Sequence, residues 1–465
     1  MKRKILIVSL LIVILIMAGL FLKNKLIQPL RLQELNLNVQ DRILILAPHP
    51  DDEVLACGGI IQKARDMNIP VKIIFLTYGD NNQWSFLLYR KHPVVRPKAV
   101  QTMGLIRHDE ALQADKTLGL SSEQLLFLGY PDFRTLAIWY SHWADRPAAS
   151  GMFTEVKVVP YSNAFRPGAP YKGEEILTDL KTIFRDFKPT KIFLSHPADH
   201  NPDHRALYLF SRVALWDLEK EIKPEIYPYI IHYKRWPKPG GYNPELSLVP
   251  PLLFQRNIAW FSLKLTSGEI EVKHKAIKQH RSQYDASKKY LLSFIRSNEL
   301  FGDFDPIILT TKLPSILLTS KSKEDLTTPP EELLNEERAL FVGIEKRSVA
   351  LIDGNLVITT TLSRPLGKEA GISVYVFGYR HDTDFKDMPK LHIKFGAIEH
   401  HIFDQDIPLA KNIITVTRKP KEIMITIPLE LLGNPQRILT SANTYVGLVP
   451  LDWVAWRILE ITDKP

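Results

Sequence analysis

The alternation of short apolar runs with longer amphipathic segments between residues 42 and 233 limits the folds open to this chain. The apolar runs have the length of buried strands, and segments with helical periodicity lie between them. The runs are 42–47, 71–77, 125–130, 191–196 and 226–233, and the helical segments are 53–67, 97–118, 174–187 and 203–219. This order predicts an α/β fold, a doubly wound parallel sheet with helices on both faces. No Gly-x-Gly-x-x-Gly follows the first run, which argues against a dinucleotide site.

Residues 47–53, Ala-Pro-His-Pro-Asp-Asp-Glu, place a histidine and two adjacent carboxylates directly after the first apolar run. Ligands of open α/β sheets bind outside the carboxyl ends of the strands, so these side chains are candidates for a site. Imidazole and carboxylate together suit a borderline metal such as zinc. Two neighbouring aspartates allow one to bind metal while the other handles a proton. The alternative is a polar turn whose acidic residues stabilise the start of a helix.

Two further segments join this one in a family resemblance. Residues 196–206 read His-Pro-Ala-Asp-His-Asn-Pro-Asp-His-Arg-Ala, and residues 273–283 fit the pattern Lys-x-x-Ala-x-x-x-His-x-Ser-Gln. With 47–53, they resemble the PIG-L / LmbE-like family of zinc-dependent N-acetylglucosaminyl deacetylases, although Pro48 stands where the family usually has alanine. The resemblance covers roughly residues 40–302. It implies a Rossmann-like fold, a zinc cofactor and hydrolysis of an N-acetyl amide.

The resemblance also implies the roles of four residues. His49, Asp52 and His204 match the metal ligands of the family, and Asp51 matches its general base. Three protein ligands leave one position of a zinc ion open, where the metal can activate water and stabilise an oxyanion.

Asn201 is the main departure from the family pattern. Many members have a histidine at this place, assigned to transition-state stabilisation or acid catalysis. Asn201 followed by Pro202 is also a good start for a helix, so a capping role and a catalytic role both remain open. An amide can donate to an oxyanion, but it cannot supply a proton at neutral pH.

Several other polar and aromatic residues have two open interpretations. By resemblance, His280 protonates the leaving amine or contacts the substrate; otherwise it is a helix-face histidine without chemistry. Arg107 and Asp132 are implied to bind sugar hydroxyls, although separately they look like surface charges. The aromatic residues of the long loops could stack on sugar rings or pack the loops onto the body, namely Trp84, Trp139, Tyr140 and Trp143.

A composition shift divides the chain near residue 319. Residues 319–338 are rich in Lys, Glu, Thr and Pro and are interpreted as a linker. It would separate a deacetylase-like domain, 42–318, from a C-terminal domain, 339–465. Short strand-like runs with turn residues between them predict an all-β sandwich there. This sandwich is expected to be separable and not needed for the chemistry, and either a carbohydrate-binding or a purely structural role is open.

The N-terminal residues 1–25 predict an uncleaved signal anchor. Lys2, Arg3 and Lys4 precede an uncharged run at 5–22 that is long enough for a membrane-spanning helix. The basic residues favour a cytoplasmic N-terminus, which would place the rest of the chain outside the membrane after a connector at 26–41. No small-x-small cleavage site follows the run. Secretion after signal cleavage is the alternative.

Net charge limits the classes of binding partner expected for this chain, and cysteine content limits its disulfides. The formal net charge is +9, but the lysines are scattered and no arginine-rich run or nucleic-acid motif is present. We therefore expect no nucleic-acid partner and a basic surface that favours anionic envelope components. The single cysteine, Cys57, excludes an intramolecular disulfide.

These features together predict an extracytoplasmic, membrane-anchored zinc amidohydrolase. Its substrate would be the N-acetyl amide of an N-acetylglucosamine-type unit in an envelope glycan or glycoconjugate. Two alternatives remain open: a catalytically degenerate glycan-binding protein, and an amide hydrolase that acts on a non-sugar acyl amide.

Overall fold

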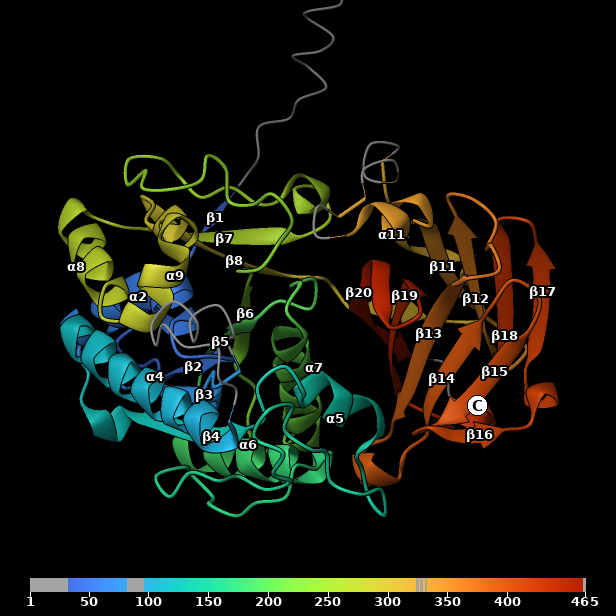
Figure 1. Ribbon diagram of the computed structural model, residues 1–465, viewed down its shortest axis with the longest axis horizontal. Coiled ribbons are helices and arrows are strands. Elements are labelled where there is room, and N and C mark those ends of the chain that lie inside the picture. The colour runs from blue at the N-terminus through green and yellow to red at the C-terminus, as the bar shows by residue number, and fades with distance from the viewer. Residues whose placement is uncertain (1–31, 82–95, 323–325, 327–328, 331–332, 463–465) are drawn as a thin grey trace, which may run out of the picture.

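A parallel sheet lies at the centre of the first part of the chain (Figure 1). The computed structural model describes all residues except 1–31, 82–95, 323–325, 327–328, 331–332 and 463–465. The five strands lie in the order β4-β3-β2-β5-β6, with every neighbouring pair parallel. They are β2 (Ile43–Ala47), β3 (Val71–Thr77), β4 (Leu125–Tyr130), β5 (Lys191–Ser195) and β6 (Glu225–Tyr229). The chain order reverses at β2, which is where ligands of such sheets bind.

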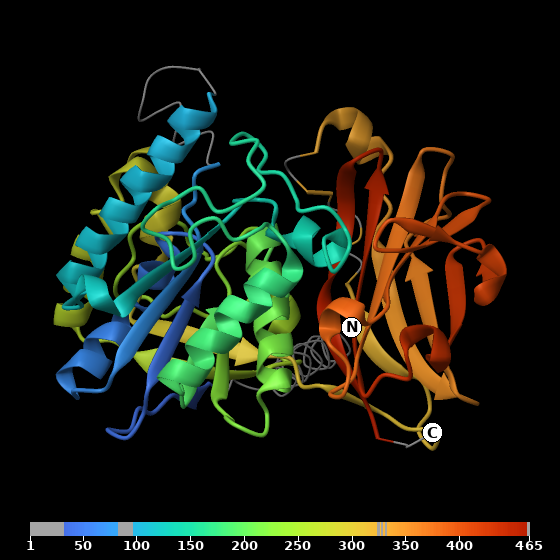
Figure 2. The same cartoon turned by 90° about the horizontal axis from the view of Figure 1, so that it is seen from below.

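Helices cover both faces of this sheet (Figure 2). One layer contains α2 (Asp52–Asp66), α4 (Pro97–Leu118) and α8 (Ser267–Ile277). The other contains α6 (Gly173–Phe187) and α7 (Pro202–Asp217), with the short α5 (Thr135–Ser141) beside α7. The α/β prediction is therefore confirmed.

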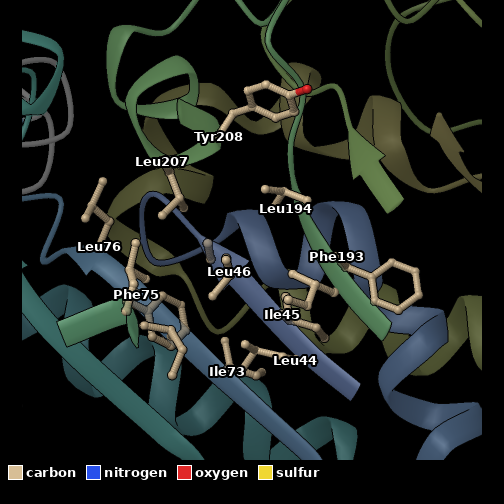
Figure 3. Packing of buried hydrophobic residues seen from close by; sticks show 14 of the residues in the cluster. Leu44, Ile45, Leu46, Ile73, Phe75, Leu76, Phe193, Leu194, Leu207 and Tyr208 are labelled. Carbon is tan, nitrogen blue, oxygen red and sulfur yellow. The ribbon is translucent and has the colours of Figure 1, made fainter. Parts of the chain in front are cut away.

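The sheet is buried on both faces, as its sequence requires. All five residues of β2, Ile-Leu-Ile-Leu-Ala, are buried. Leu44, Ile45 and Leu46 lie next to Ile73 and Phe193 of the neighbouring strands (Figure 3). A continuous apolar run of this kind is typical of a parallel strand that is covered by helices on both sides.

A small second sheet lies beside the parallel one. It has the order β1-β7-β8, formed by β1 (Gln33–Glu34), β7 (Ala259–Lys264) and β8 (Asn298–Asp303). Helices α8 and α9 (Arg281–Leu291) lie between β7 and β8 in the chain. This arrangement brings the 273–283 segment and β8 against α2.

The C-terminal β region, which we define as residues 307–462, contains two further sheets (Figure 1). One has the order β10-β11-β12-β18-β17 and the other β16-β15-β14-β13-β19-β20-β9. The strands of the first are β10 (Ile316–Ser320), β11 (Ile344–Ile352), β12 (Asn355–Leu362), β17 (Thr415–Lys419) and β18 (Glu422–Pro428). Those of the second are β9 (Ile307–Leu309), β13 (Ala370–Tyr379), β14 (Lys390–Phe395), β15 (His400–Asp404), β16 (Ile407–Leu409), β19 (Arg437–Val446) and β20 (Val449–Ile461). Apolar side chains from both sheets form one core between them.

The β region begins earlier than the composition shift suggests. Strands β9 and β10 begin before residue 319, yet β9 pairs with β20 and β10 pairs with β11. The expected linker at 319–338 contains a short helix, α11 (Asn335–Ala339). The chain therefore enters the β-rich part at Ile307.

One apolar core crosses from the α/β part into the β region. Trp139 of α5 is fully buried and lies 5.7 Å from Phe377 and 6.3 Å from Trp456, measured between ring centroids. Tyr140 stacks on Tyr375 at 4.4 Å. Trp139 and Tyr140 therefore pack the two parts together and do not form a sugar platform, while Trp84 lies outside the described residues. This contact argues against the expected separability of the sandwich.

The predicted transmembrane segment, and with it the membrane-anchored extracytoplasmic location, requires correction. In the part of the chain that the structure describes, no helix is long and apolar enough to cross a membrane. The longest described helix, α4, carries charged residues along its length, among them Lys98, Arg107, Glu110 and Lys116. The run at 5–22 on which the prediction rested lies outside the described residues.

Candidate active site

Polar side chains from several strand ends meet at one edge of the parallel sheet. His49 and Asp51 lie in the turn between β2 and α2, and Asp52 is the first residue of α2. Asp132 follows β4, and His204 lies in the first turn of α7, which follows β5. Because the strands are parallel, their carboxyl ends share this edge, as the sequence predicted.

His49, Asp52 and His204 converge on one point. Asp52 Oδ2 lies 3.2 Å from His49 Nδ1 and 3.1 Å from His204 Nε2. The candidate ligand atoms of the three residues all lie within 4.8 Å of one another, and all three side chains are buried. Two imidazoles and one carboxylate form a donor set that suits a zinc-like metal and leaves a fourth position open. The structure thus brings together the three residues that the sequence singled out.

Carboxylates behind the two histidines orient their rings. Asp199 Oδ2 lies 3.2 Å from His204 Nδ1, and the same oxygen accepts hydrogen bonds from the backbone N–H groups of Ile231 and His232. His49 Nε2 lies 3.1 Å from both Asp132 and Asp203. These contacts leave Nδ1 of His49 and Nε2 of His204 facing Asp52. Carboxylate–histidine pairs of this kind fix the tautomer and the orientation of metal-binding imidazoles.

The electrostatics of the cluster favour a bound cation. Burial lowers the pKa of His204, but the charges of Asp199 and Asp52 outweigh it and raise that pKa to about 9. Burial raises the pKa of Asp52, yet His204 and His49 hold it well below its usual value. Both ring nitrogens of His204 are buried without an aligned hydrogen bond. The carboxylates around His204 attract a proton to its ring. A metal ion would take the place of that proton, so these residues fit a zinc-like metal.

His49, Asp132 and Asp203 form a second group with metal-ligand spacing. Asp203, however, already accepts hydrogen bonds from Phe133 N, Thr135 N and Thr135 Oγ1. Asp132 accepts one from Asn81 N. We therefore assign these two carboxylates to holding His49.

Asp51 lies beside the ligand cluster in a strained backbone conformation. Its φ of 127° and ψ of −28° are rare for a residue with a side chain. Such outliers gather at functional sites, where the surrounding structure enforces them. Burial raises the pKa of the Asp51 carboxyl, Arg107 lowers it and Asp52 raises it again, to about 7 in balance. Arg107 Nη2 lies 3.6 Å from Asp51 Oδ2.

His280 lies between α8 and α9 and reaches the same site. Its Nε2 is 3.1 Å from Glu53 Oε1, and its Nδ1 is buried without a hydrogen bond. Burial lowers the pKa of His280, but the negative charges of Glu53 and Asp51 outweigh it and raise the pKa. A protonated imidazole next to Asp51 has the chemistry of a proton donor.

The three sequence segments support one another physically. Glu299 of β8 accepts hydrogen bonds from the backbone N–H groups of Gly59 and Ile60 and from Lys273 Nζ. A Cβ at Gly59 would lie 2.2 Å from a methyl carbon of Leu265 and 3.0 Å from Glu299 Oε2, so a larger residue would force these side chains to shift. The lysine of the third segment thus holds the helix that begins with Asp52.

Lys273→Met should destabilise the folded protein by about 3–5 kcal/mol, because it leaves the buried Glu299 carboxylate without its cationic partner. Both side chains are 1% exposed and their charged atoms are 2.6 Å apart. Urea denaturation measures the free energy of unfolding. Lys275→Met on the same helix is the matched control, because its pair with Glu271 is exposed and should change stability by no more than about 1 kcal/mol. Equal effects of both variants would contradict the assigned role of Lys273.

The structure gives Asn201 and Arg107 specific contacts. Asn201 is the N-cap of α7, and its Oδ1 accepts a hydrogen bond from Asp203 N. Arg107 donates to the backbone oxygens of Gly79 and Pro50, so it braces the turn that carries Asp51. A catalytic role for Asn201 and sugar binding by Arg107 and Asp132 stay predictions.

Sequence reasoning assigned no role to several residues of the site. Asp199 and Glu53 lie inside the segments 196–206 and 47–53, but no individual role was predicted for either residue. His232 follows β6, and its ring lies 4.8 Å from that of His204. Its position near the end of the apolar run at 226–233 was the signal that could have identified it. Phe133 follows Asp132 and lies over the ring of His49.

The fold and the site together define an α/β domain with a buried His/Asp cluster that could hold a metal. Residues 44–215 match the family model PIG-L, described as GlcNAc-PI de-N-acetylase, and this part of the chain is a PIG-L domain. The resemblance expected from the sequence is thereby confirmed. No curated protein matches the chain.

Three solved structures are among those similar to this chain. The conserved protein TT1542 from Thermus thermophilus is 22% identical, with 55% of this chain and 85% of that chain covered and a TM-score of 0.33. The N,N'-diacetylchitobiose deacetylase from Pyrococcus horikoshii is 20% identical, with 55% and 79% covered and a TM-score of 0.33. GalB, the 4-carboxy-2-hydroxymuconate hydratase from Pseudomonas putida, is 14% identical, with 59% and 100% covered and a TM-score of 0.33.

Proposed function

We propose that the chain is a zinc-dependent amidohydrolase that removes the N-acetyl group from an N-acetylglucosamine-type unit of a glycan or glycoconjugate. The observation that carries the proposal is the convergence of His49, Asp52 and His204 on one point, with Asp51 adjacent. The PIG-L match supports the same reaction class.

The residues around this point provide the remaining chemistry of amide hydrolysis. A zinc ion held by the three ligands would polarise the acetyl carbonyl and make a water molecule more acidic. Asp51 accepts a proton from the attacking water. His280 gives a proton to the sugar nitrogen as the C–N bond breaks, so the products are acetate and an amino sugar. Arg107 holds the Asp51 turn through Pro50 O, and Asp199, Asp132 and Asp203 hold the two imidazoles.

Acetate release tests the proposed reaction. The full chain, supplied with zinc, is incubated with N,N'-diacetylchitobiose and with N-acetylated glycans, and free acetate and new primary amine are both measured. We expect equal amounts of the two products. Chelation should abolish the activity and added zinc should restore it. A protein that holds zinc and binds these sugars without releasing acetate would instead be a degenerate, glycan-binding member, the rival that Asn201 leaves open.

His49→Ala, Asp52→Ala and His204→Ala should each lower the zinc content of folded protein well below one ion per chain. Removing one of three ligands leaves a site that no longer matches the usual coordination of zinc. Metal analysis after gel filtration measures the content, and circular dichroism shows that the variants are folded. His401→Ala, at an exposed position in the β region, is the control and should keep full occupancy. Full occupancy in all three ligand variants would refute the assignment.

A further inference from the structure

An exposed apolar surface borders the otherwise polar site. Phe133 is 42% exposed, and its ring stacks on His49 at a centroid distance of 6.2 Å and an interplanar angle of 29°. Met152 is 49% exposed, and its sulfur accepts a hydrogen bond from Asn81 Nδ2. Asn81 N in turn donates to Asp132, the residue before Phe133. We call Phe133 and Met152 the apolar lip.

The backbone of Phe133 indicates that its phenyl ring is not needed for the turn. Its φ of 59° lies in the left-handed region, where a bulky residue is an outlier and glycine is favoured. Its N–H donates to Asp203, a contact that glycine would also make. The turn therefore favours glycine, and the exposed ring adds apolar surface next to a candidate metal ligand.

The lip and the proposed proton donor are held by different elements around the ligand cluster. His280 is tied to α2 through Glu53. Phe133 is tied to α7 through Asp203 and stacks on His49. If the amide nitrogen of a substrate faces His280, its acyl substituent points away from His280. Charged residues near His280 suit sugar hydroxyls, whereas an aromatic ring and a flexible thioether suit an alkyl chain.

We propose that the apolar lip binds the acyl group of the substrate and that the enzyme accepts, and prefers, N-acyl chains longer than acetyl. This inference rests on the proposed function and specifies the substrate class of the same site. The chemistry is unchanged: water adds to the carbonyl carbon, the C–N bond breaks, and a longer carboxylate leaves in place of acetate. Burial of only two extra methylene groups is worth about tenfold in affinity.

The test uses glucosamine with N-acetyl, N-butanoyl and N-octanoyl groups. Release of primary amine gives kcat/KM for the full chain and for Phe133→Gly, Met152→Ala and Ile398→Ala. Phe133→Gly removes the ring and also relieves the backbone, so it should fold. Ile398 is 87% exposed in a turn of the β region and is the control. We expect kcat/KM for the octanoyl substrate to exceed that for the acetyl substrate by about tenfold or more, and this ratio to approach one in Phe133→Gly.

A binding measurement separates this inference from the proposed function. Calorimetry with Asp51→Asn protein gives the Kd of N-octanoyl- and N-acetylglucosamine without turnover. Suppose that no N-acyl sugar is hydrolysed, yet octanoylglucosamine binds at least about tenfold more tightly than acetylglucosamine and loses this advantage in Asp51→Asn/Phe133→Gly. The proposed function would then be wrong, and binding of the acyl group by the apolar lip would still be supported. Equal affinity for both ligands overturns the inference. The inference is also overturned if Phe133→Gly lowers the affinity equally for every acyl length, because the ring would then contact the sugar.

Discussion

Asp51→Asn should keep its zinc and lower kcat by about 10² to 10⁴, the usual contribution of a general base. Asparagine preserves the size of the side chain but cannot accept the proton of water at neutral pH. Asp52, not Asp51, lies within 3.2 Å of both candidate histidine ligands, so the metal site should survive. Stopped acetate-release assays give kcat and KM, and metal analysis gives the zinc content.

Two companion variants make this result decisive. Asp52→Asn should lose zinc, because Asp52 contacts both histidines of the cluster. Asp66, at the other end of α2, pairs with the exposed Arg65, and Asp66→Asn should behave like the parent. Loss of zinc in Asp51→Asn with retention in Asp52→Asn would reverse the two roles. Undiminished turnover of Asp51→Asn would eliminate Asp51 as the base.

A chain that ends at Asp305, without the β region, should fail to fold cooperatively. Truncation would expose Trp139, Tyr140 and Trp143, which pack against Phe377, Tyr375 and Phe385 of the β region. The loss of one such large aromatic contact is typically worth about 3–5 kcal/mol. Three such losses together are comparable to the roughly 5–15 kcal/mol by which whole proteins are stable. Urea unfolding followed by circular dichroism and by tryptophan fluorescence measures the effect.

Point variants of the full chain test the same contact without truncation. Trp139→Ala should lower the free energy of unfolding by about 3–5 kcal/mol, because Trp139 is fully buried between α7 and β13. Leu448→Ala is the control, since Leu448 is fully exposed in the β region. A truncated chain that unfolds in one transition at the parental urea concentration would restore the view of two independent domains.

The parallel sheet was predictable because buried strands have an unambiguous pattern. The runs at 42–47, 71–77 and 125–130 correspond to β2, β3 and β4 to within one residue. The ligand trio was predictable for a related reason: parallel strands bring their carboxyl ends to one edge. For His280 the sequence left a helix-face position open as an alternative, and the structure places this residue between α8 and α9. Its short flanking segments carry too little periodicity to locate a break.

Other features depend on contacts that the sequence cannot reveal. Asp51 has a positive φ in the turn after β2, and no local sequence pattern encodes this conformation. Trp139 and Tyr140 belong to α5, at the start of a segment that its Pro and Gly content predicted to be a loop, and in such a segment exposure to sugar and burial against another sheet look alike. Only the position of β13 and β20 shows that these side chains are buried against another sheet. The pairing of β9 with β20 joins residues far apart in the chain and lies outside the reach of local propensity.

The core shared by the α/β part and the β region has a thermodynamic consequence. The turn that carries His204 also touches the β region directly, since Arg205 lies 4.2 Å above the ring of Trp453. If the two parts unfold as one unit, every ligand of the folded state stabilises both by RT ln(1 + [L]/Kd). Zinc at the edge of the parallel sheet would then raise the melting temperature of strands that never contact it. Metal supply would thereby govern how long the whole chain persists against proteolysis.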